Sequence, residues 1–572
     1  MSSNKSINLD FKEFISASQT KNFILDDPIQ DWLKKYGKEY GFNPIVNNNF
    51  SDFIKKKGIE FENHIMETLR KKHLVFEIDN SLSNIDKFNI TKDKMKEGIP
   101  IIYQGLVIDF EDKLFGYPDL LVRNDYLDKI TNFKNEYTRK SDKSWHYVII
   151  DIKYSNLNLK KNDNILNNTG MFACFKSQII IYNQCLSKMQ NFNPELSFIL
   201  GRKWKKGNKK GNNSFDYLGK IDIYGKDNSI LHKTNQAIEW IKNLNKYGNS
   251  LDFLKQIPPN MKCNYDDEWR IIKKKMATEK KEITSLWNCG VKERNLAHSK
   301  NIYDWNDKNL YAETLNIHGK RGRIINNILK TNRSDNILVS PRKIKKLENL
   351  KNLEKRRVEF ICDFETVNDL NDNFKKIPYS NYDSCIFLIG IITRIINNKG
   401  DIVSSNFNYF LTEDFTRKEE KRIINEWLNF MDELSKKYKV EKPKIYHWSN
   451  AEPNFYKQAI IRNKQVFNWK ELNFVDILDI FKSEPISIKG VLNYGLKDIS
   501  KGLHNLKLIN TIWDNDMNGR KALLEAAEAM NESKKENIKF SDLEVVKKII
   551  EYNYVDVKVI DEIINFLRNK LI

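Results

Sequence analysis

The stretch HYVIIDIKYS, residues 146–155, places four β-formers directly before an acid and a lysine that are two residues apart. The run YVII, residues 147–150, is typical of a buried strand. In a strand, residues i and i+2 point to the same side, so we expect Asp151 and Lys153 to lie together at its end. Opposite charges at that position indicate either a salt bridge or a functional site.

Length and charge bound the kind of protein. At 572 residues the chain is too long for one compact core, and two or three domains are expected. Lysine and arginine together number 96 against 76 aspartate and glutamate residues, which gives a formal net charge of +20. This excess favours a polyanionic partner, with nucleic acid as the first candidate and a solvated basic surface as the alternative.

The cysteines and the N-terminus indicate a soluble intracellular protein of the cytoplasm or nucleus. The six cysteines show no CxxC pair and no paired Cys/His spacing, so neither zinc nor a secreted disulfide framework is expected. The stretch MSSNKSINLDFKEF, residues 1–14, has no apolar region of the kind found in signal peptides. No run approaches the length of a membrane span, and no membrane partner is expected.

The pattern along the chain predicts an α/β protein in three parts. Residues 1–245 alternate helical patterns with short β-rich runs, which is typical of an α/β domain. Residues 246–352 become helical and strongly charged and predict a connector; its last charged helical stretch is PRKIKKLENLKNLEKRR, residues 341–357. Residues 353–572 return to strand alternation and end in a long helix.

Two local patterns have alternative interpretations. The stretch GRKWKKGNKKGNN, residues 201–213, is predicted to be a basic loop, either a solvated hairpin tip or a nucleic-acid contact. Its candidate nucleic-acid-binding residues are Arg202, Lys203, Trp204, Lys205 and Lys206. The helix–Gly–helix pattern at residues 282–305 indicates either an element that grips DNA or plain helical packing.

Further candidate site residues surround the opening stretch in the sequence. The helical pattern at residues 53–72 places Glu62 on its apolar stripe, where a carboxylate needs a cation or donors unless it reaches water at the helix edge. Asp119 follows a Gly-Tyr-Pro turn and precedes a predicted strand. Gln178 and Tyr182 lie at i and i+4 on one face of a predicted helix.

Taken in order, these motifs resemble the RecB-type branch of the PD-(D/E)xK nucleases over about residues 58–190. The resemblance implies a restriction-endonuclease-like fold in which Mg²⁺ or Mn²⁺ is held by Glu62, Asp119 and Asp151. It also implies that Lys153 orients or polarises the attacking water and that Gln178 and Tyr182 are accessory residues near DNA. Divalent ions on carboxylates suit phosphodiester hydrolysis because they supply a nucleophile and neutralise phosphoryl charge. The cysteine set with which some relatives bind an iron–sulfur cluster is not evident, so no cluster is expected.

The stretch EFICDFETVND, residues 359–369, repeats the opening geometry with glutamate in place of lysine. Asp363 and Glu365 share a strand face, and because neighbouring carboxylates repel, a divalent cation is their natural companion. An exposed strand end is the alternative. On the C-terminal helix, Tyr552 and Asp556 lie at i and i+4 in register with apolar positions, so this acid is expected to face the packed side.

This second set resembles the RNase H-like DEDD exonucleases of the tyrosine subtype over about residues 355–570. The resemblance implies four acids that bind two metal ions and a tyrosine that positions water. Asp363, Glu365 and Asp556 match the acids, and Tyr552 matches the tyrosine. The usual aspartate of the central motif is missing; Glu452 is the candidate for its place, and Asp476 is the alternative.

The order of the two regions is similar to that of predicted RecB-family nucleases whose C-terminal half is RNase H-like. We therefore expect two α/β nuclease-type domains joined by a helical connector, and a metal-dependent nuclease, in particular an exonuclease, that acts on DNA rather than RNA through either or both sites. Two alternatives stay open: a non-catalytic nucleic-acid-binding protein built on these folds, and an RNA exonuclease that uses only the DEDD-like half.

Overall fold

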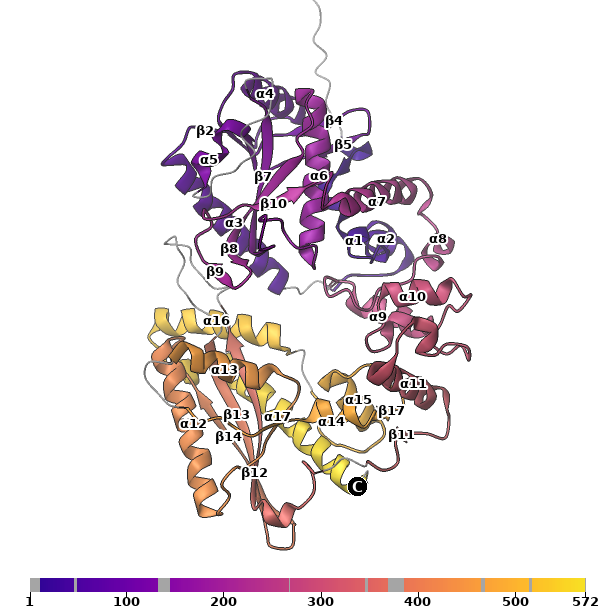
Figure 1. Cartoon of the computed structure of the whole chain (residues 1–572), viewed down its shortest axis with the longest axis vertical. Helices are drawn as coiled ribbons and strands as arrows, with labels where there is room; N and C mark the ends of the chain where they lie inside the picture. The colour runs from indigo at the N-terminus through magenta and orange to yellow at the C-terminus, as the bar shows by residue number, and fades with distance from the viewer. Residues whose placement is uncertain are drawn as a thin grey trace, which may run out of the picture. The chain divides into compact units, whose positions relative to one another are not determined.

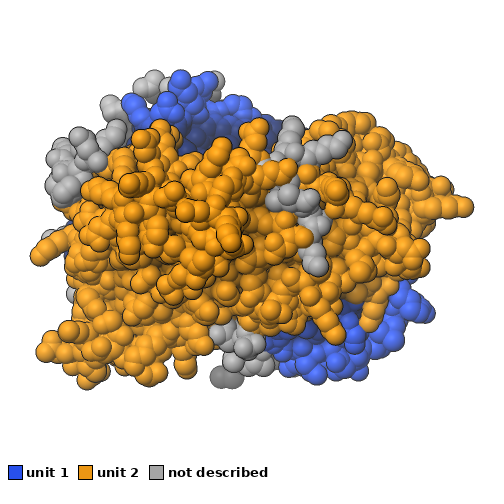
Figure 2. All heavy atoms as spheres, turned by 90° about the horizontal axis from the view of Figure 1, so that it is seen from below, with its two compact units in different colours: residues 1–276, 372–381 blue, residues 277–371, 382–572 orange. Residues whose placement is uncertain are grey.

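The computed structural model describes residues 11–45, 49–131, 145–266, 268–344, 348–368, 385–463, 469–513 and 517–570. The chain divides into two compact units, coloured in Figure 2: unit 1 is residues 1–276 with 372–381, and unit 2 is residues 277–371 with 382–572. Each unit combines sheets with helices (Figure 1), which confirms the predicted mixed α/β class. Within the described residues, no helix is long and apolar enough to cross a membrane.

Unit 1 is built on one large sheet, one small sheet and nine helices among its described residues. The helices are α1 (Lys21–Ile24), α2 (Ile29–Tyr36), α3 (Asn49–Arg70), α4 (Asn84–Lys96), α5 (Leu127–Ile130), α6 (Met171–Gln190), α7 (Asn228–Tyr247), α8 (Leu251–Lys255) and α9 (Arg270–Glu279), whose last turn extends into unit 2. The strands are β1 (Ile15–Ser16), β2 (Val75–Glu77), β3 (Ile101–Tyr103), β4 (Val107–Asp109), β5 (Leu114–Gly116), β6 (Leu120–Arg123), β7 (Tyr147–Leu159), β8 (Leu196–Lys206), β9 (Lys209–Gly211) and β10 (Gly219–Asp222).

Strand β7 is central to the large sheet, whose order is β10-β8-β7-β6-β3-β2, with β9 paired to β8. It runs parallel to β8 and antiparallel to β6. Its residues alternate between two cores: Val148 and Ile150 pack with α3, whereas Tyr147 and Ile149 pack with α6. The YVII run is therefore buried on both faces, as the sequence predicted. The strand continues to Leu159, however, so Asp151 and Lys153 lie within it and not, as was expected, at its end.

Unit 2 contains a five-stranded sheet, a two-stranded sheet and further helices. The helices are α10 (Val291–His298), α11 (Gly319–Arg333), α12 (Arg417–Lys437), α13 (Ala451–Asn463), α14 (Ile477–Ser483), α15 (Leu496–Asn505), α16 (Gly519–Glu536) and α17 (Glu544–Lys570). The strands are β11 (Val339–Ser340), β12 (Val358–Val367), β13 (Cys385–Ile396), β14 (Ile402–Leu411), β15 (Ile445–His447), β16 (Phe474–Asp476) and β17 (Ser487–Ile488).

The five-stranded sheet has the order β14-β13-β12-β15-β16, with β12 in the centre. The pairs on the β13 side of β12 are antiparallel, and those on the β15 side are parallel. Phe360 and Cys362 of β12 pack against α12, whereas Ile361 lies in the core that contains α17. The predicted alternation is confirmed, and it turns Asp363 and Glu365 toward the α17 side.

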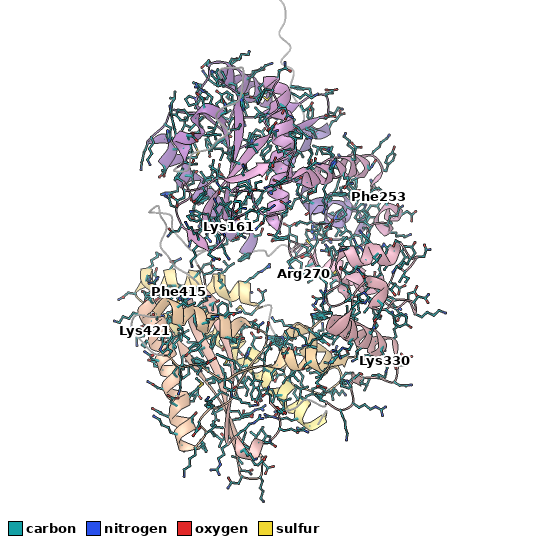
Figure 3. All side chains as sticks on the ribbon, viewed as in Figure 1. Lys161, Phe253, Arg270, Lys330, Phe415 and Lys421 are labelled. Carbon is teal, nitrogen blue, oxygen red and sulfur yellow. The ribbon has the colours of Figure 1, made fainter. Side chains whose placement is uncertain are left out.

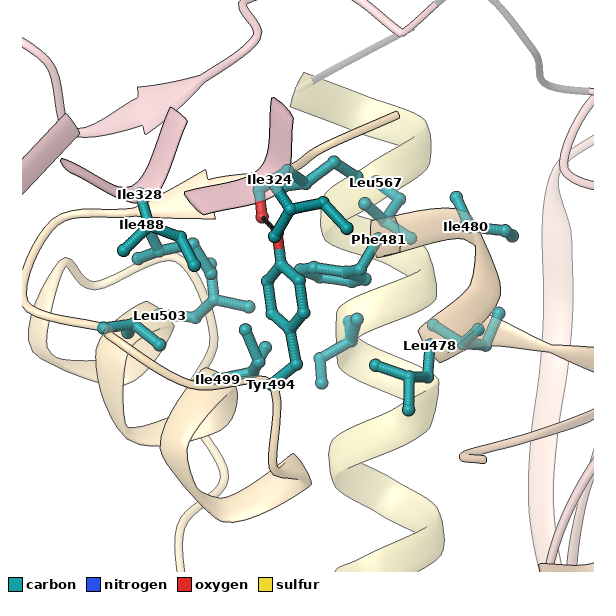
Figure 4. Close-up of a cluster of buried hydrophobic side chains, with 14 of the residues drawn as sticks. Ile324, Ile328, Leu478, Ile480, Phe481, Ile488, Tyr494, Ile499, Leu503 and Leu567 are labelled. Atoms are coloured by element: carbon teal, nitrogen blue, oxygen red, sulfur yellow. Dashed lines mark hydrogen bonds between the residues drawn. The ribbon is translucent and has the colours of Figure 1, made fainter. Parts of the chain in front are cut away.

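The predicted connector is divided between the two units. Residues 254–276 pack against α2 in a core that contains Trp32 and Trp269. Figure 4 shows the other part: Ile324 and Ile328 of α11 lie in the unit 2 core around Tyr494, whose hydroxyl donates to the Ile486 oxygen at 2.8 Å. The predicted boundaries at residues 245 and 353 therefore differ from the boundary between the units, which falls within α9.

The helical prediction for residues 341–357 is wrong in the part that the structure describes. That part contains only one short 3₁₀ turn, Leu353–Lys355. Ile344 and Leu350 are buried in the unit 2 core, and Arg356 donates to the Tyr446 hydroxyl at 2.6 Å. Burial of these residues in the core, and not helical periodicity, therefore determines the described part of this stretch, and its density of charged residues was a misleading indication of a helix.

A buried ion cluster fixes residues 254–276 to the N-terminal helices. Lys273 of α9 is fully buried and forms ion pairs with Asp27 and with Asp266, the latter at 2.6 Å. It also donates to the backbone oxygen of Asn260 at 3.1 Å, and Gln30 donates to Asp27 at 2.6 Å. One cation therefore compensates two buried carboxylates from distant parts of the sequence.

Replacing Lys273 with methionine is expected to lower the free energy of unfolding of unit 1 by about 3–5 kcal/mol, because Asp27 and Asp266 remain buried without a cation. Urea unfolding followed by tryptophan fluorescence measures the change. Lys275→Met, at an exposed position of the same helix, is the control and should change the stability by less than about 0.5 kcal/mol. Equal urea midpoints for the two variants would contradict this account of the cluster.

Candidate active sites

In unit 1, Asp119 and Asp151 lie opposite each other at the end of a strand pair. In the antiparallel register of β6 and β7, Leu120 pairs with Ile150. Asp119 and Asp151 are therefore the next two residues that face each other. The backbone N–H of Ile152 donates to Asp119 Oδ2 at 2.6 Å, and Lys153 Nζ forms an ion pair with Asp151 Oδ2. The structure thus brings three of the predicted site residues together.

The carboxylate of Asp151 is enclosed but incompletely satisfied. Asp151 is only 1 % exposed, and apart from the Lys153 ion pair neither oxygen accepts a hydrogen bond from the described residues. A buried carboxylate with open acceptor positions is costly, which makes it a candidate ligand for a cation.

Charge interactions shift the pKa values of its neighbours. Burial raises the pKa of Asp119 well above its ordinary value, and repulsion by Asp151 and Glu62 adds to this, whereas Lys153 opposes it. Burial alone would lower the pKa of Lys153, but Asp151, Asp119 and Glu62 raise it above its ordinary value. The lysine therefore stays protonated beside the acids.

Glu62 approaches this group from α3 and is held by two donors. The Tyr103 hydroxyl and Gln104 Nε2 both donate to Glu62 Oε1 at 2.9 Å. Gln104 has a positive φ of 59° directly after β3, and its backbone N–H donates to the backbone oxygen of Asp119 at 3.0 Å. Neither donor was predicted, because their role depends on how α3 packs over the end of β3.

Gln178 and Tyr182 lie together on α6, as predicted. Gln178 Nε2 donates to the Tyr182 hydroxyl at 2.6 Å. The tyrosine ring lies directly over Gly116, where a Cβ atom would be 2.0 Å from Tyr182 Cε1. The glycine of the Gly-Tyr-Pro turn therefore makes room for the ring. Burial, with Asp151 and Asp119, raises the pKa of Tyr182 well above its ordinary value, so its hydroxyl stays neutral.

The predicted basic loop is a β-hairpin made of β8 and β9. Arg202 is only 3 % exposed; its guanidinium lies 4.8 Å from the Tyr154 ring centroid and donates to Asn156 Oδ1 at 3.2 Å. Trp204 is partly buried and its Nε1 donates to Asp216 Oδ2 at 3.0 Å. Arg202 thus links β8 to β7, and Trp204 links β8 to the segment after β9; nucleic-acid binding by these two residues stays a prediction.

The lysines of the hairpin carry its exposed charge. Lys205 is exposed, whereas Lys203 and Lys206 are half-buried. Lys209 and Lys210 on β9 are also exposed. Lys161, labelled in Figure 3, lies beside the turn, with its Cγ 3.5 Å from the Cβ position of Gly207.

In unit 2, Asp363, Glu365 and Asp556 each place one carboxylate oxygen within 4.8 Å of those of the other two. Glu365 is 8 % and Asp556 7 % exposed. Strand β12 supplies the first two acids and α17 the third, as the sequence predicted. Within the described part of the chain, no other group of three His, Cys, Asp or Glu side chains meets this spacing, and the unit 1 acids do not.

The position of Glu452 distinguishes it from Asp476. Glu452 is in the first turn of α13, 3 % exposed, and its Oε2 lies 3.2 Å from His447 Nδ1. Burial raises the pKa of Asp363 well above its ordinary value, and Asp556, Glu365 and Glu452 raise it further, so Glu452 faces the acid cluster. Asp476 instead accepts the backbone N–H of Leu478 at 2.8 Å as the N-cap of α14.

The acids of unit 2 repel one another. Burial raises the pKa of Glu365 to about 8, and the charges of Asp556 and Glu452 contribute, whereas Lys497 opposes the shift. Burial raises the pKa of Asp556 to about 6, although hydrogen bonds from Tyr552 and Trp513 lower it. Buried carboxylates that share a site in this way suit a hard divalent cation, which prefers oxygen ligands.

Asn553 was not predicted, yet it links the helix to the acid-bearing strand. Its Nδ2 donates to Asp363 Oδ2 at 2.8 Å. Gly390 pairs with Asp363 across β12 and β13, and a Cβ atom on Gly390 would lie 1.7 Å from Asn553 Oδ1. The signal available in the sequence was this glycine within the apolar strand CIFLIGIITRI, since such a glycine often marks a close approach of another group.

Trp513 and Lys497 also adjoin the acid cluster and were not predicted as site residues. Trp513 Nε1 donates to Asp556 Oδ1 at 2.9 Å. Lys497 Nζ lies 5.1 Å from the ring centroids of both Trp513 and Tyr552. Lys497 reaches the site through the packing of α15, and Trp513 lies in the segment that follows this helix; no local pattern in the sequence indicates either placement.

Comparisons with known proteins identify no relative: no protein-family model matches the chain, and no curated protein matches it.

Glu365→Gln is expected to stabilise the protein without added metal, and more so at high pH. Because the pKa of Glu365 is raised from 4.5 to about 8, the folded wild type binds a proton that the unfolded chain has lost, and its stability falls between these pH values. Glutamine does not titrate, so the variant does not lose stability in this way. Its free energy of unfolding should exceed that of the wild type by an amount that increases between pH 5 and pH 8.5 and reaches on the order of a few kcal/mol.

Thermal unfolding at several pH values, with and without Mn²⁺, measures both effects. Mn²⁺ should stabilise the wild type more than Glu365→Gln, because the variant has lost a candidate ligand. Glu354→Gln, at an exposed position, is the control and should follow the wild type. A Glu365→Gln advantage that is equal at all pH values would contradict the assigned repulsion.

Gly390→Ala is expected to push Asn553 away from Asp363, because the added Cβ atom overlaps the asparagine amide. The predicted cost is about 1–3 kcal/mol of stability and about a tenfold loss of Mn²⁺ affinity, measured by urea unfolding and calorimetry. The control is Gly519→Ala, where no atom lies within 4 Å of the new Cβ. Unchanged Mn²⁺ affinity in Gly390→Ala would rule out a role of Asn553 in orienting Asp363.

Proposed function

We propose that this protein is a metal-dependent nuclease that hydrolyses phosphodiester bonds of nucleic acid, DNA in particular, and that the acid cluster of unit 2 is one of its active sites. The observation that carries the proposal is the group of half-buried Asp363 with buried Glu365 and Asp556, with oxygens within 4.8 Å of one another. Like charges that are largely buried are costly, and their presence together on the central strand of a well-packed sheet is typical of a functional site. The net charge of +20 supports a polyanionic substrate.

In this proposal, Asp363, Glu365, Asp556 and Glu452 hold Mg²⁺ or Mn²⁺. Such ions, when bound, lower the pKa of a coordinated water and neutralise charge on phosphoryl oxygens. The hydroxyl of Tyr552, which is kept neutral because burial and the charges of Asp556 and Glu365 raise its pKa, orients a water molecule. The water oxygen bonds to phosphorus and loses its proton to solvent, while the bond from phosphorus to the leaving sugar oxygen breaks and that oxygen takes up a proton.

A second active site is proposed in unit 1. Its support is the pairing of Asp119 with Asp151 and the protonated Lys153 beside them. In this proposal the two aspartates and Glu62 hold a divalent cation, and Lys153 Nζ orients or polarises the attacking water. The open acceptor positions of Asp151 agree with a cation ligand. Its acids are spaced more widely than those of unit 2, so we rank it second.

The test compares Asp363→Asn, Asp151→Asn and the double variant on single- and double-stranded DNA and RNA with Mg²⁺ or Mn²⁺. We expect Asp363→Asn to lower the main cleavage activity at least about 100-fold and the double variant to remove what remains, because a neutral amide is a poor ligand for these ions. Asp479→Asn, at an exposed position of α14, is the control and should retain full activity.

The outcomes separate the proposal from its alternatives. A folded wild-type protein that cleaves none of these substrates but binds them in a salt-sensitive manner would identify a non-catalytic nucleic-acid-binding protein. Cleavage of RNA alone, abolished by Asp363→Asn and unaffected by Asp151→Asn, would identify a single-site RNA exonuclease. Full activity in the double variant would exclude both proposed sites.

A further inference from the structure

Lys497 lies at the rim of the acid cluster in unit 2. It is in the first turn of α15, directly after Leu496, and its side chain is exposed. Its Nζ donates to the backbone oxygen of Met517 at 2.9 Å and lies 5.1 Å from the ring centroids of Trp513 and Tyr552. Two aromatic rings and one carbonyl oxygen therefore hold the ammonium in a defined place.

The charge of Lys497 is directed at the acids without being neutralised by a close ion pair. Asp556 and Glu365 both act on its ammonium group: although the residue as a whole is exposed, partial burial of the ammonium group lowers the pKa of Lys497, and these two charges oppose that shift. Among the described residues, however, no carboxylate oxygen lies within 4.0 Å of its Nζ. An ammonium group has three donors, and within the described part of the chain the one hydrogen bond of this group is to Met517, which leaves two donors for a ligand.

The fold holds α15 tightly enough to position this side chain. Ile499 and Leu503 of α15 are buried in the core around Tyr494 (Figure 4). Gly502 lies against Val491, where a Cβ atom would be only 2.1 Å from Val491 Cγ2. The helix is thus fixed on its inner face while Lys497 projects from its first turn.

We infer that Lys497 is a substrate-binding residue of this site, whose ammonium group contacts a phosphate oxygen of a nucleic-acid strand placed at the acid cluster. The inference rests on the proposed function. A phosphodiester that approaches Asp363, Glu365, Asp556 and Glu452 meets four carboxyl groups, and a cation at their rim offsets this repulsion. A lysine on a fixed helix supplies a point charge with free donors, which suits a phosphate oxygen.

Trp513 contacts both an acid of the cluster and Lys497. Its indole N–H donates to Asp556, and its ring supports the Lys497 ammonium. The same side chain therefore fixes the position of an acid and of the cation relative to each other. A phosphate that contacts Lys497 is held at a set distance from Asp556, which is what a binding residue beside a hydrolytic centre requires.

The experiment measures binding of a fluorescently labelled single-stranded oligonucleotide to the full chain by anisotropy, with Ca²⁺ present and over a series of salt concentrations. The variants are Lys497→Met, Lys497→Arg and, as a matched control, Lys501→Met at an exposed position of the same helix. Calorimetry with Mn²⁺ and cleavage kinetics are measured on the same proteins.

Lys497→Met should weaken oligonucleotide binding about 10- to 100-fold and reduce the slope of log affinity against log salt by about one, since one phosphate contact is lost. Its Mn²⁺ affinity should be unchanged or higher, because a positive charge near the acids is removed. Lys497→Arg, which keeps the charge, should bind within about threefold of the wild type, and Lys501→Met should match the wild type.

Three results would overturn the inference. Unchanged oligonucleotide affinity and salt slope in Lys497→Met, with normal cleavage, would show that Lys497 does not contact the substrate while leaving the proposed function intact. Equal losses in Lys497→Arg and Lys497→Met, or loss of Mn²⁺ binding, would assign it a structural role. A wild type that neither binds nor cleaves nucleic acid would overturn the proposed function and with it this inference.

Discussion

Repulsion between buried carboxylates is the constraint on which the organisation of both units depends. Each unit places acids on a central strand that packs against apolar cores on both sheet faces, as with Asp151 on β7 and Asp363 on β12. Burial raises the pKa of several of these acids, and their proximity adds to it. Such an arrangement persists only because large cores on both sheet faces supply the stability that the acids reduce.

The two sites relieve this repulsion differently. In unit 1, Lys153 lies two residues from Asp151 on the same strand and forms an ion pair with it. In unit 2, glutamate occupies the equivalent position, and an opposing positive charge comes from Lys497, on a helix more than a hundred residues further along the chain. The first site is therefore partly neutralised from within its own strand, whereas the second keeps a greater excess of negative charge and suits a cation from solution better.

Other buried charges in the protein show what a purely structural arrangement looks like. Lys176 of α6 pairs with Asp227 at 2.6 Å and donates to the backbone oxygen of Leu166 at 2.7 Å. Glu359 accepts from Arg568 at 2.7 and 2.9 Å. In these pairs a cation and hydrogen bonds compensate each acid, whereas Asp151 and Glu452 retain oxygens that accept no hydrogen bond from the described residues. That difference distinguishes the candidate sites from buried ion pairs that only stabilise the fold.

The sequence predicted the parts of the fold and site that depend on local periodicity. The alternation around Asp363 and the i, i+4 spacing of Tyr552 and Asp556 placed these residues on packed faces, because strand and helix geometry is fixed over a few residues. The roles of Gln104, Asn553 and Lys497 could not be predicted in the same way. Each reaches its site only when a helix or strand that is distant in the sequence packs against it. Such a contact produces no periodic pattern in the sequence.

Asp476 shows how such long-range contacts determine which acid belongs to the site. It accepts backbone N–H groups from both Leu478 and Ser449, each at 2.8 Å. Ser449 has a φ of 74°, a strained conformation for a residue with a side chain, and it lies between β15 and α13. By holding this turn, Asp476 sets where α13 begins and so directs Glu452, in its first turn, toward the acid cluster. The two residues that the sequence offered as alternatives are therefore complementary: Glu452 faces the acid cluster, and Asp476 fixes the backbone that presents it.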